Sequence, residues 1–238
     1  MPAKRAPKTS TPAATRTGFK SATLDARPDR LDFRDRTYRP PLRSLDPRFP
    51  SENHIKAYLP AYAAAKLVLD QGREGACTGF GLACAINYLF FVRHVESGGD
   101  PGTFERVSPR MLYELARRYD EWPGEEYEGS SCRGALKGWH KHGVCTDSLW
   151  PYRTSDGDVR LLKPKERWAQ DAVTRPLGVY YRVNRRSVVD MQAAIREIGT
   201  IYVSARVHDG WDRVPTLPAQ TSHAGIPVIP PPDRKSVV

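Results

Sequence analysis

A long apolar segment, residues 78–96, follows directly on a loop, residues 70–77, that is punctuated by glycines. Its apolar side chains recur at helical spacing on more than one side, with Phe80 and Ile86 on one side and Leu82 on another, so the segment predicts a helix that is apolar most of the way round. A helix of that kind must be covered by other elements on nearly every side. The chain is therefore expected to fold around residues 78–96.

The loop delivers Cys77 to the first turn of this helix. Because the amides and the dipole at a helix N-terminus favour a thiolate over a thiol, Cys77 is the candidate nucleophile. Gln71 lies six residues upstream on the same loop, and its side-chain NH2 can turn toward the cysteine to stabilise an oxyanion. The alternative for Cys77 is a small buried hydrophobe, and the glycine-rich loop favours the nucleophile.

The segment from Gln71 to Cys77 resembles the active-site loop of papain-like cysteine peptidases, in which Gln-Gly and four further residues precede the nucleophilic Cys. Other segments resemble that family in the same chain order: Asp29–Arg34, Val107–Leu112, Gly129–Ser131, His142–Val144 and Trp150–Tyr152. The resemblance covers roughly residues 29–210. It implies an α+β, papain-like two-lobed fold, in which a helical lobe carries the Cys and an antiparallel β-barrel lobe carries a His.

The resemblance also implies a function, a bacterial-type cysteine peptidase that acts on peptide or protein substrates and needs no cofactor or metal. Cys77 would attack the peptide carbonyl, and Gln71 with the Cys77 backbone N–H would form the oxyanion hole. Gly129 and Ser130 would form one wall of the substrate cleft. The chain departs from the family pattern at Glu74, where many members have a disulfide-bonded Cys, and at Thr78, where a Trp is common.

The family's catalytic His, set in a Gly-His-Ala strand, and its Asn-Ser-Trp are not recognisable in this sequence. His208 and His223 fall in the expected window beyond Cys77. His223 precedes an Ala as in the family, but prolines follow it, and proline cannot donate to the sheet ladder that should hold a catalytic His. We therefore expect the sequence to stop at Val238 before the true motif, with an incomplete β lobe. His223 is the alternative base.

Four segments predict helices on their spacing and end signals: residues 78–96, 109–120, 131–143 and 187–198. Alternating apolar residues predict strands at 177–183 and 201–207. Residues 31–60 are proline-rich and are expected to be irregular.

The expected organisation is a disordered basic tail over residues 1–28 and a peptidase domain over residues 29–238. Within that domain, the helical lobe would span about 66–170 and the partial β lobe about 171–238.

The acidic loop 120–128 precedes the expected cleft wall, and its carboxylates would favour basic residues in a bound peptide if they line the cleft; a solvated loop is the alternative. A zinc site built from Cys132, His140, His142 and Cys145 is not expected, because side chains two residues apart on a helix point about 200° apart.

The formal net charge of +10 makes an acidic partner worth considering. Two other functions stay open. One is a catalytically inactive papain-like binding module, and the other is a nucleic-acid-binding protein that uses the basic tail, although the charge is diffuse and no recognition motif is present. Four cysteines are too few for a disulfide scaffold, no apolar run reaches the length of a membrane span, and the N-terminus lacks a signal-peptide apolar region. These features predict a cytoplasmic protein without a membrane partner.

Overall fold

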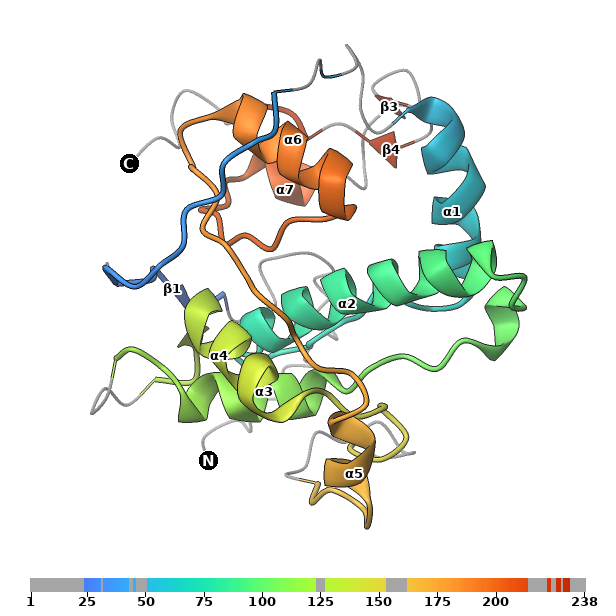
Figure 1. Ribbon diagram of the computed structural model, residues 1–238, viewed down its shortest axis with the longest axis vertical. Helices are drawn as coiled ribbons and strands as arrows, with labels where there is room; N and C mark the ends of the chain where they lie inside the picture. The colour runs from blue at the N-terminus through green and yellow to red at the C-terminus, as the bar shows by residue number, and fades with distance from the viewer. Residues whose placement is uncertain are drawn as a thin grey trace, which may run out of the picture.

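The computed structural model describes residues 24–30, 32–42, 45, 51–122, 127–152, 162–213, 222–223, 226–227 and 229–231. Its elements in chain order are β1 (Ala26–Arg27), α1 (Glu52–Ala64), α2 (Cys77–Glu96), the 3-10 turn η2 (Pro101–Thr103), α3 (Pro109–Arg118), β2 (Ser130–Ser131), α4 (Cys132–His142), α5 (Trp168–Ala172), α6 (Val188–Ile198), α7 (Gly210–Arg213), β3 (Ser222–His223) and β4 (Ile226–Pro227). Figure 1 shows their arrangement.

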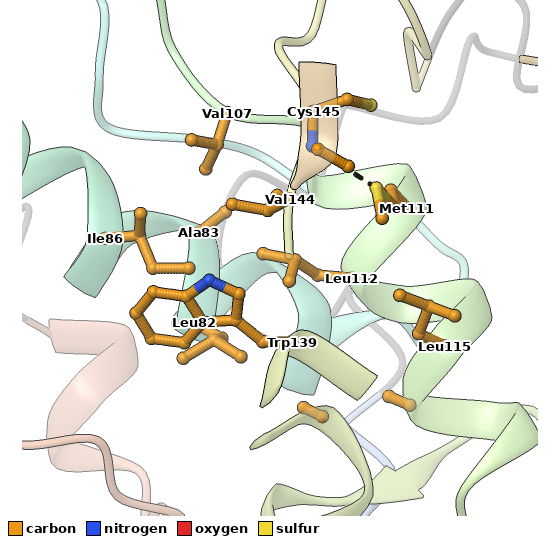
Figure 2. Packing of buried hydrophobic residues seen from close by; sticks show 13 residues of the cluster. Leu82, Ala83, Ile86, Val107, Met111, Leu112, Leu115, Trp139, Val144 and Cys145 are labelled. Carbon is orange, nitrogen blue, oxygen red and sulfur yellow. Dashed lines mark hydrogen bonds between the residues drawn. The ribbon is translucent and has the colours of Figure 1, made fainter. Parts of the chain in front are cut away.

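Helix α2 crosses the middle of the molecule, with α3 and α4 along one side of it and α6 and α7 on the other (Figure 1). Its residues Leu82 and Ile86 pack with Leu112 of α3 and Trp139 of α4 in the main hydrophobic core (Figure 2). The Trp139 indole N–H, the polar atom of this cluster, donates to the Arg175 carbonyl at 2.9 Å. The expectation of a central, buried helix at residues 78–96 is thus confirmed.

The predicted helix ends are formed by the expected capping residues. The hydroxyls of Ser108, Ser131 and Ser187 accept hydrogen bonds from backbone N–H groups three residues later, at the starts of α3, α4 and α6. Gly143 and Gly199, at φ values of +70° and +98°, end α4 and α6. Local capping residues therefore account for where α3, α4 and α6 begin and where α4 and α6 end.

Helix α1 begins inside residues 31–60, the segment expected to be irregular, and ends four residues beyond it, at Ala64. The hydroxyl of Ser51 accepts a hydrogen bond from the His54 N–H at 3.2 Å and starts the helix, and Pro60 lies inside it. Tyr62 packs its ring on Phe91 of α2. The prolines of residues 31–60 suggested loop, but capping by Ser51 and this aromatic contact outweigh the single proline.

The predicted strands at 177–183 and 201–207 are wrong. Neither segment forms a strand, and the nearest feature is an isolated bridge between Thr37 and Arg182. Alternating apolar residues make a strand only when a neighbour supplies the ladder, and here Val179 and Val203 are exposed. Within the described residues the sheets are two short pairs, β1 with β2 and β3 with β4, so the expected β-barrel lobe is not seen there.

A groove of about 1160 Å³ separates α2 and α4 from α6. Its lining combines apolar side chains, among them Leu82 and Met191, with charged ones such as Asp35 and Arg133. In the part of the chain that the structure describes, no helix combines the length and apolarity needed to cross a bilayer.

Candidate active site

Cys77 is the first residue of α2 and is half-buried. Burial raises the pKa of its thiol above the ordinary 9.0, while hydrogen bonding to the backbone of Asp25 and Thr78 acts in the opposite direction. The Asp25 carboxylate raises the pKa further by charge repulsion. In this arrangement burial outweighs the hydrogen bonds that favour the thiolate, so the helix N-terminus alone does not lower the pKa of Cys77.

Gln71 lies on the loop before Cys77 and is also half-buried. Its side-chain Nε2 donates to the backbone carbonyl of Glu74 at 3.0 Å. The backbone carbonyl of Gln71 accepts a hydrogen bond from the Tyr152 hydroxyl at 2.8 Å. The ring of Tyr152 packs edge-on against Phe80, in the first turn of α2. These contacts fix the Gln71 amide to the loop that carries the nucleophile candidate.

The residues expected to form the cleft wall lie beside the start of α2. Ser130 is buried, and its Oγ is 2.5 Å from Oγ1 of Thr78, the residue after Cys77. Gly129 is buried next to it, at the start of the short strand β2. The structure therefore brings Cys77 and the Gly129–Ser130 segment together across 52 residues of sequence.

The loop is tied down by an ion pair at the position where the sequence departs from the family. Arg110, 1% exposed on α3, donates from both terminal nitrogens to the carboxylate of Glu74, at 2.8 and 2.9 Å. On the other side, the Gly75 N–H donates to the Glu128 carboxylate at 3.3 Å. An ion pair to α3 and a hydrogen bond to Glu128, next to Gly129, thus hold the loop from two directions.

We expect Glu74→Gln to lower the free energy of unfolding by about 3 kcal/mol, because the buried Arg110 guanidinium loses its bidentate partner. Glu114, at 3.2 Å, stays as its other carboxylate. Urea unfolding measures the effect, and Glu52→Gln, which removes an exposed ion pair on α1, is the matched control with a change below about 1 kcal/mol. Equal effects of the two substitutions would show that Glu74 does not hold the loop.

A segment predicted to be disordered lies directly on this site. Residues 1–23 of the expected tail lie outside the described residues, but Ala26 and Arg27 form β1 and pair in parallel with Ser130 and Ser131. The Gly129 N–H donates to the Asp25 carboxylate at 3.2 Å. For residues 24–28 the prediction of disorder is wrong, because backbone pairing and polar contacts seat the segment without the apolar periodicity that sequence patterns detect.

The described histidine side chains bind elsewhere. Two of them hydrogen-bond to tyrosine hydroxyls: His54 to Tyr88 and His142 to Tyr119. The other three hydrogen-bond to backbone groups: His94 to the Asp100 carbonyl, His140 to the Leu177 and Gly178 carbonyls, and His208 to the Gly210 N–H. His223 lies in β3, and its side chain is outside the described residues. The structure therefore pairs none of the described histidine side chains with Cys77.

Among the described residues, no group of three or more His, Cys, Asp or Glu is placed to hold a metal. Two neighbours of Cys77 were not found from the sequence. The Tyr202 hydroxyl donates to the Thr78 carbonyl at 2.8 Å, and it also interacts with the thiol of Cys132. Because these residues come from segments far apart in sequence, no spacing pattern could have indicated them.

No family model matches the sequence, and no curated protein matches it. Among solved structures, it is similar to xylellain, a cysteine protease from Xylella fastidiosa, with a TM-score of 0.50 and 23% identity over 79% of this chain and 66% of that chain. A digestive procathepsin L 3 of Tenebrio molitor larval midgut aligns over 55% of this chain and 37% of its own, at 20% identity and a TM-score of 0.38. The chain thus spans slightly less than two thirds of xylellain, and the likeness shows the fold.

Proposed function

We propose that this chain, whose fold is papain-like and α+β, is a cysteine-type peptidase with Cys77 as its nucleophile. One observation carries the proposal: Cys77 starts the central helix of that fold, with the Gly129–Ser130 wall beside it and Gln71 on the same loop. A half-buried thiol in this position suits attack on a carbonyl, whereas a thiol that only fills space would lie within the core cluster.

The chemistry would begin with removal of the thiol proton. The Cys77 sulfur then forms a bond to the carbonyl carbon of the peptide, and the Gln71 amide and the Cys77 backbone N–H donate to the oxygen that becomes negative. The base returns the proton to the leaving amine, and water hydrolyses the resulting thioester. His223 is the candidate base within this sequence, and this role stays a prediction.

In the proposed peptidase, residues 24–28 cover Cys77 and the Gly129–Ser130 segment when no substrate is bound. A peptide substrate would lie along Gly129–Ser130, which β1 occupies, so β1 must leave before a substrate binds. Its departure would also hydrate the sulfur and reverse the burial that raises the pKa of Cys77. We therefore expect the full chain to react slowly with both substrates and thiol reagents.

The proposal is tested with an epoxysuccinyl peptide, which alkylates the nucleophile of a thiol peptidase. In the chain without residues 1–28 we expect a covalent adduct on Cys77, mapped by mass spectrometry, that forms faster than with free cysteine at the same pH. A catalytically inactive binding module would label Cys77 no faster than free cysteine. Adduct formation on Cys84 in preference to Cys77 would contradict the assignment.

A further inference from the structure

Two arginines of the N-terminal segment lie on aromatic rings beside the cleft wall. The guanidinium carbon of Arg27 is 4.3 Å from the Tyr127 ring centre and 5.9 Å from that of Trp122. The guanidinium carbon of Arg30 is 4.2 Å from the Trp122 ring centre. The Trp122 indole N–H donates to the Pro28 carbonyl at 3.3 Å, so this ring contacts the segment's backbone as well.

A carboxylate holds the Tyr127 ring in place, and a second one, Glu121, contacts the N-terminal segment. The Tyr127 hydroxyl donates to Asp120, whose other carboxylate oxygen accepts the Ser131 N–H at 2.9 Å. Glu121 accepts the backbone N–H of Arg30 at 2.9 Å. Tyr127 is therefore linked through Asp120 to the strand that forms the cleft wall. An aromatic face suits a guanidinium, which stacks on rings more readily than an ammonium does.

The spacing between Asp25 and Arg27 gives the distance, in residues, between the Cys77 sulfur and the two rings. Asp25, whose backbone lies beside the Cys77 sulfur, precedes Arg27 by two residues, and Arg27 pairs with Ser131 in the β1–β2 ladder. In an extended strand, residues two apart point to the same face. Consider a peptide that replaces β1 along Gly129–Ser130. If one of its residues lies at the Cys77 sulfur, the side chain two residues further along the peptide would reach the Trp122 and Tyr127 rings.

We propose that Trp122 and Tyr127 form a substrate subsite that binds arginine, two residues from the residue that lies over Cys77. This inference rests on the proposed peptidase function and names a substrate class for it: peptides with an arginine near the scissile bond. The segment at residues 24–30 fills the subsite with its own arginines and so acts as the stand-in for substrate in this structure.

The first test measures hydrogen exchange and does not depend on enzyme activity. In the full chain, Arg27→Met and Tyr127→Ala should each speed hydrogen exchange at the backbone amides of residues 25–30 by about threefold, the size expected of one cation–π contact. The two effects should be less than additive in the double variant, because both substitutions remove the contact between Arg27 and Tyr127. Arg34→Met, which removes an exposed ion pair with Asp32, is the control and should leave the exchange unchanged. Unchanged exchange in both single variants, or additive effects in the double variant, would overturn the subsite.

The second test uses fluorogenic peptides that carry one arginine, lysine, norleucine or glutamate at each position near the scissile bond. We expect arginine at one position to raise kcat/KM about tenfold over norleucine, mainly through KM. Tyr127→Ala should remove that preference, measured as the ratio of kcat/KM for the arginine and norleucine peptides within each variant. Tyr127→Phe, which keeps the ring, should retain most of it. Cleavage with no arginine preference, or with one that Tyr127→Ala does not change, overturns this inference and leaves the peptidase intact. If no peptide is cleaved while the exchange result holds, the peptidase function fails and the arginine site stands.

Discussion

Cys77→Ala is expected to abolish peptide hydrolysis, with turnover reduced by at least about 10⁴-fold in the chain without residues 1–28. The reason is that the sulfur forms the bond to the carbonyl carbon, and no other group at the start of α2 can replace it in the chemistry proposed here. Turnover of a fluorogenic peptide under saturating substrate gives the measurement.

Cys84→Ala is the matched control for this substitution. Cys84 is on the same helix, is half-buried and free like Cys77, and likewise has a pKa raised by burial. Its removal should leave turnover within about twofold. Equal losses in the two variants would mean that the effect comes from the packing of α2. Hydrolysis that persists in the Cys77 variant would remove this thiol from the mechanism.

Gly129→Ala is expected to expel β1 from the cleft. A Cβ at this position would lie 1.7 Å from the Asp25 carbonyl oxygen and 2.7 Å from its carbonyl carbon, so the two backbones cannot both stay where they are. Gly129 has no left-handed φ, and alanine fits its own backbone without strain. Hydrogen exchange should show protection lost over residues 24–30, with the amides of α2 and α3 unchanged.

Gly102→Ala provides the comparison, because a Cβ there meets only the flexible carboxylate of Asp100, at 3.5 Å. The exchange of residues 24–30 should be the same as in the parent chain. If Gly129→Ala left the protection of those residues intact, the contact between Asp25 and the cleft wall would not be what seats the segment.

The helical half of the fold could be predicted because its information is local. Ser108, Ser131 and Ser187 cap helices whose apolar residues recur at the right spacing, and Gly143 and Gly199 end two of them. The position of Cys77 near the start of α2 follows from the apolar spacing, because no side chain caps this helix at Ala76. Each of these features depends on residues within one or two turns of each other, and a single sequence displays them directly.

The features that were not predicted depend on contacts between distant residues. Ala26 of β1 pairs with Ser130, which lies 104 residues later in the sequence. Tyr202 and Thr78, which are hydrogen-bonded, are 124 residues apart. The alternating segment around Val203 has the pattern of a strand but no partner to pair with. Backbone pairing uses groups that every residue has, so side-chain patterns carry little information about it.

The central claim is that Cys77 is a nucleophile covered by residues 24–28, and its most direct test is the rate of Cys77 alkylation by iodoacetamide as a function of pH. The rate is measured by mass mapping in the full chain and in the chain without residues 1–28. Because burial raises the pKa of Cys77 above 9.0, the full chain should react slowly at neutral pH, with the rate still rising above pH 9. The shortened chain should react faster at neutral pH, since loss of the covering segment lowers the pKa of Cys77 and raises its thiolate fraction. Superimposable profiles for the two chains, with Cys77 no more reactive than Cys84 in either, would contradict the account.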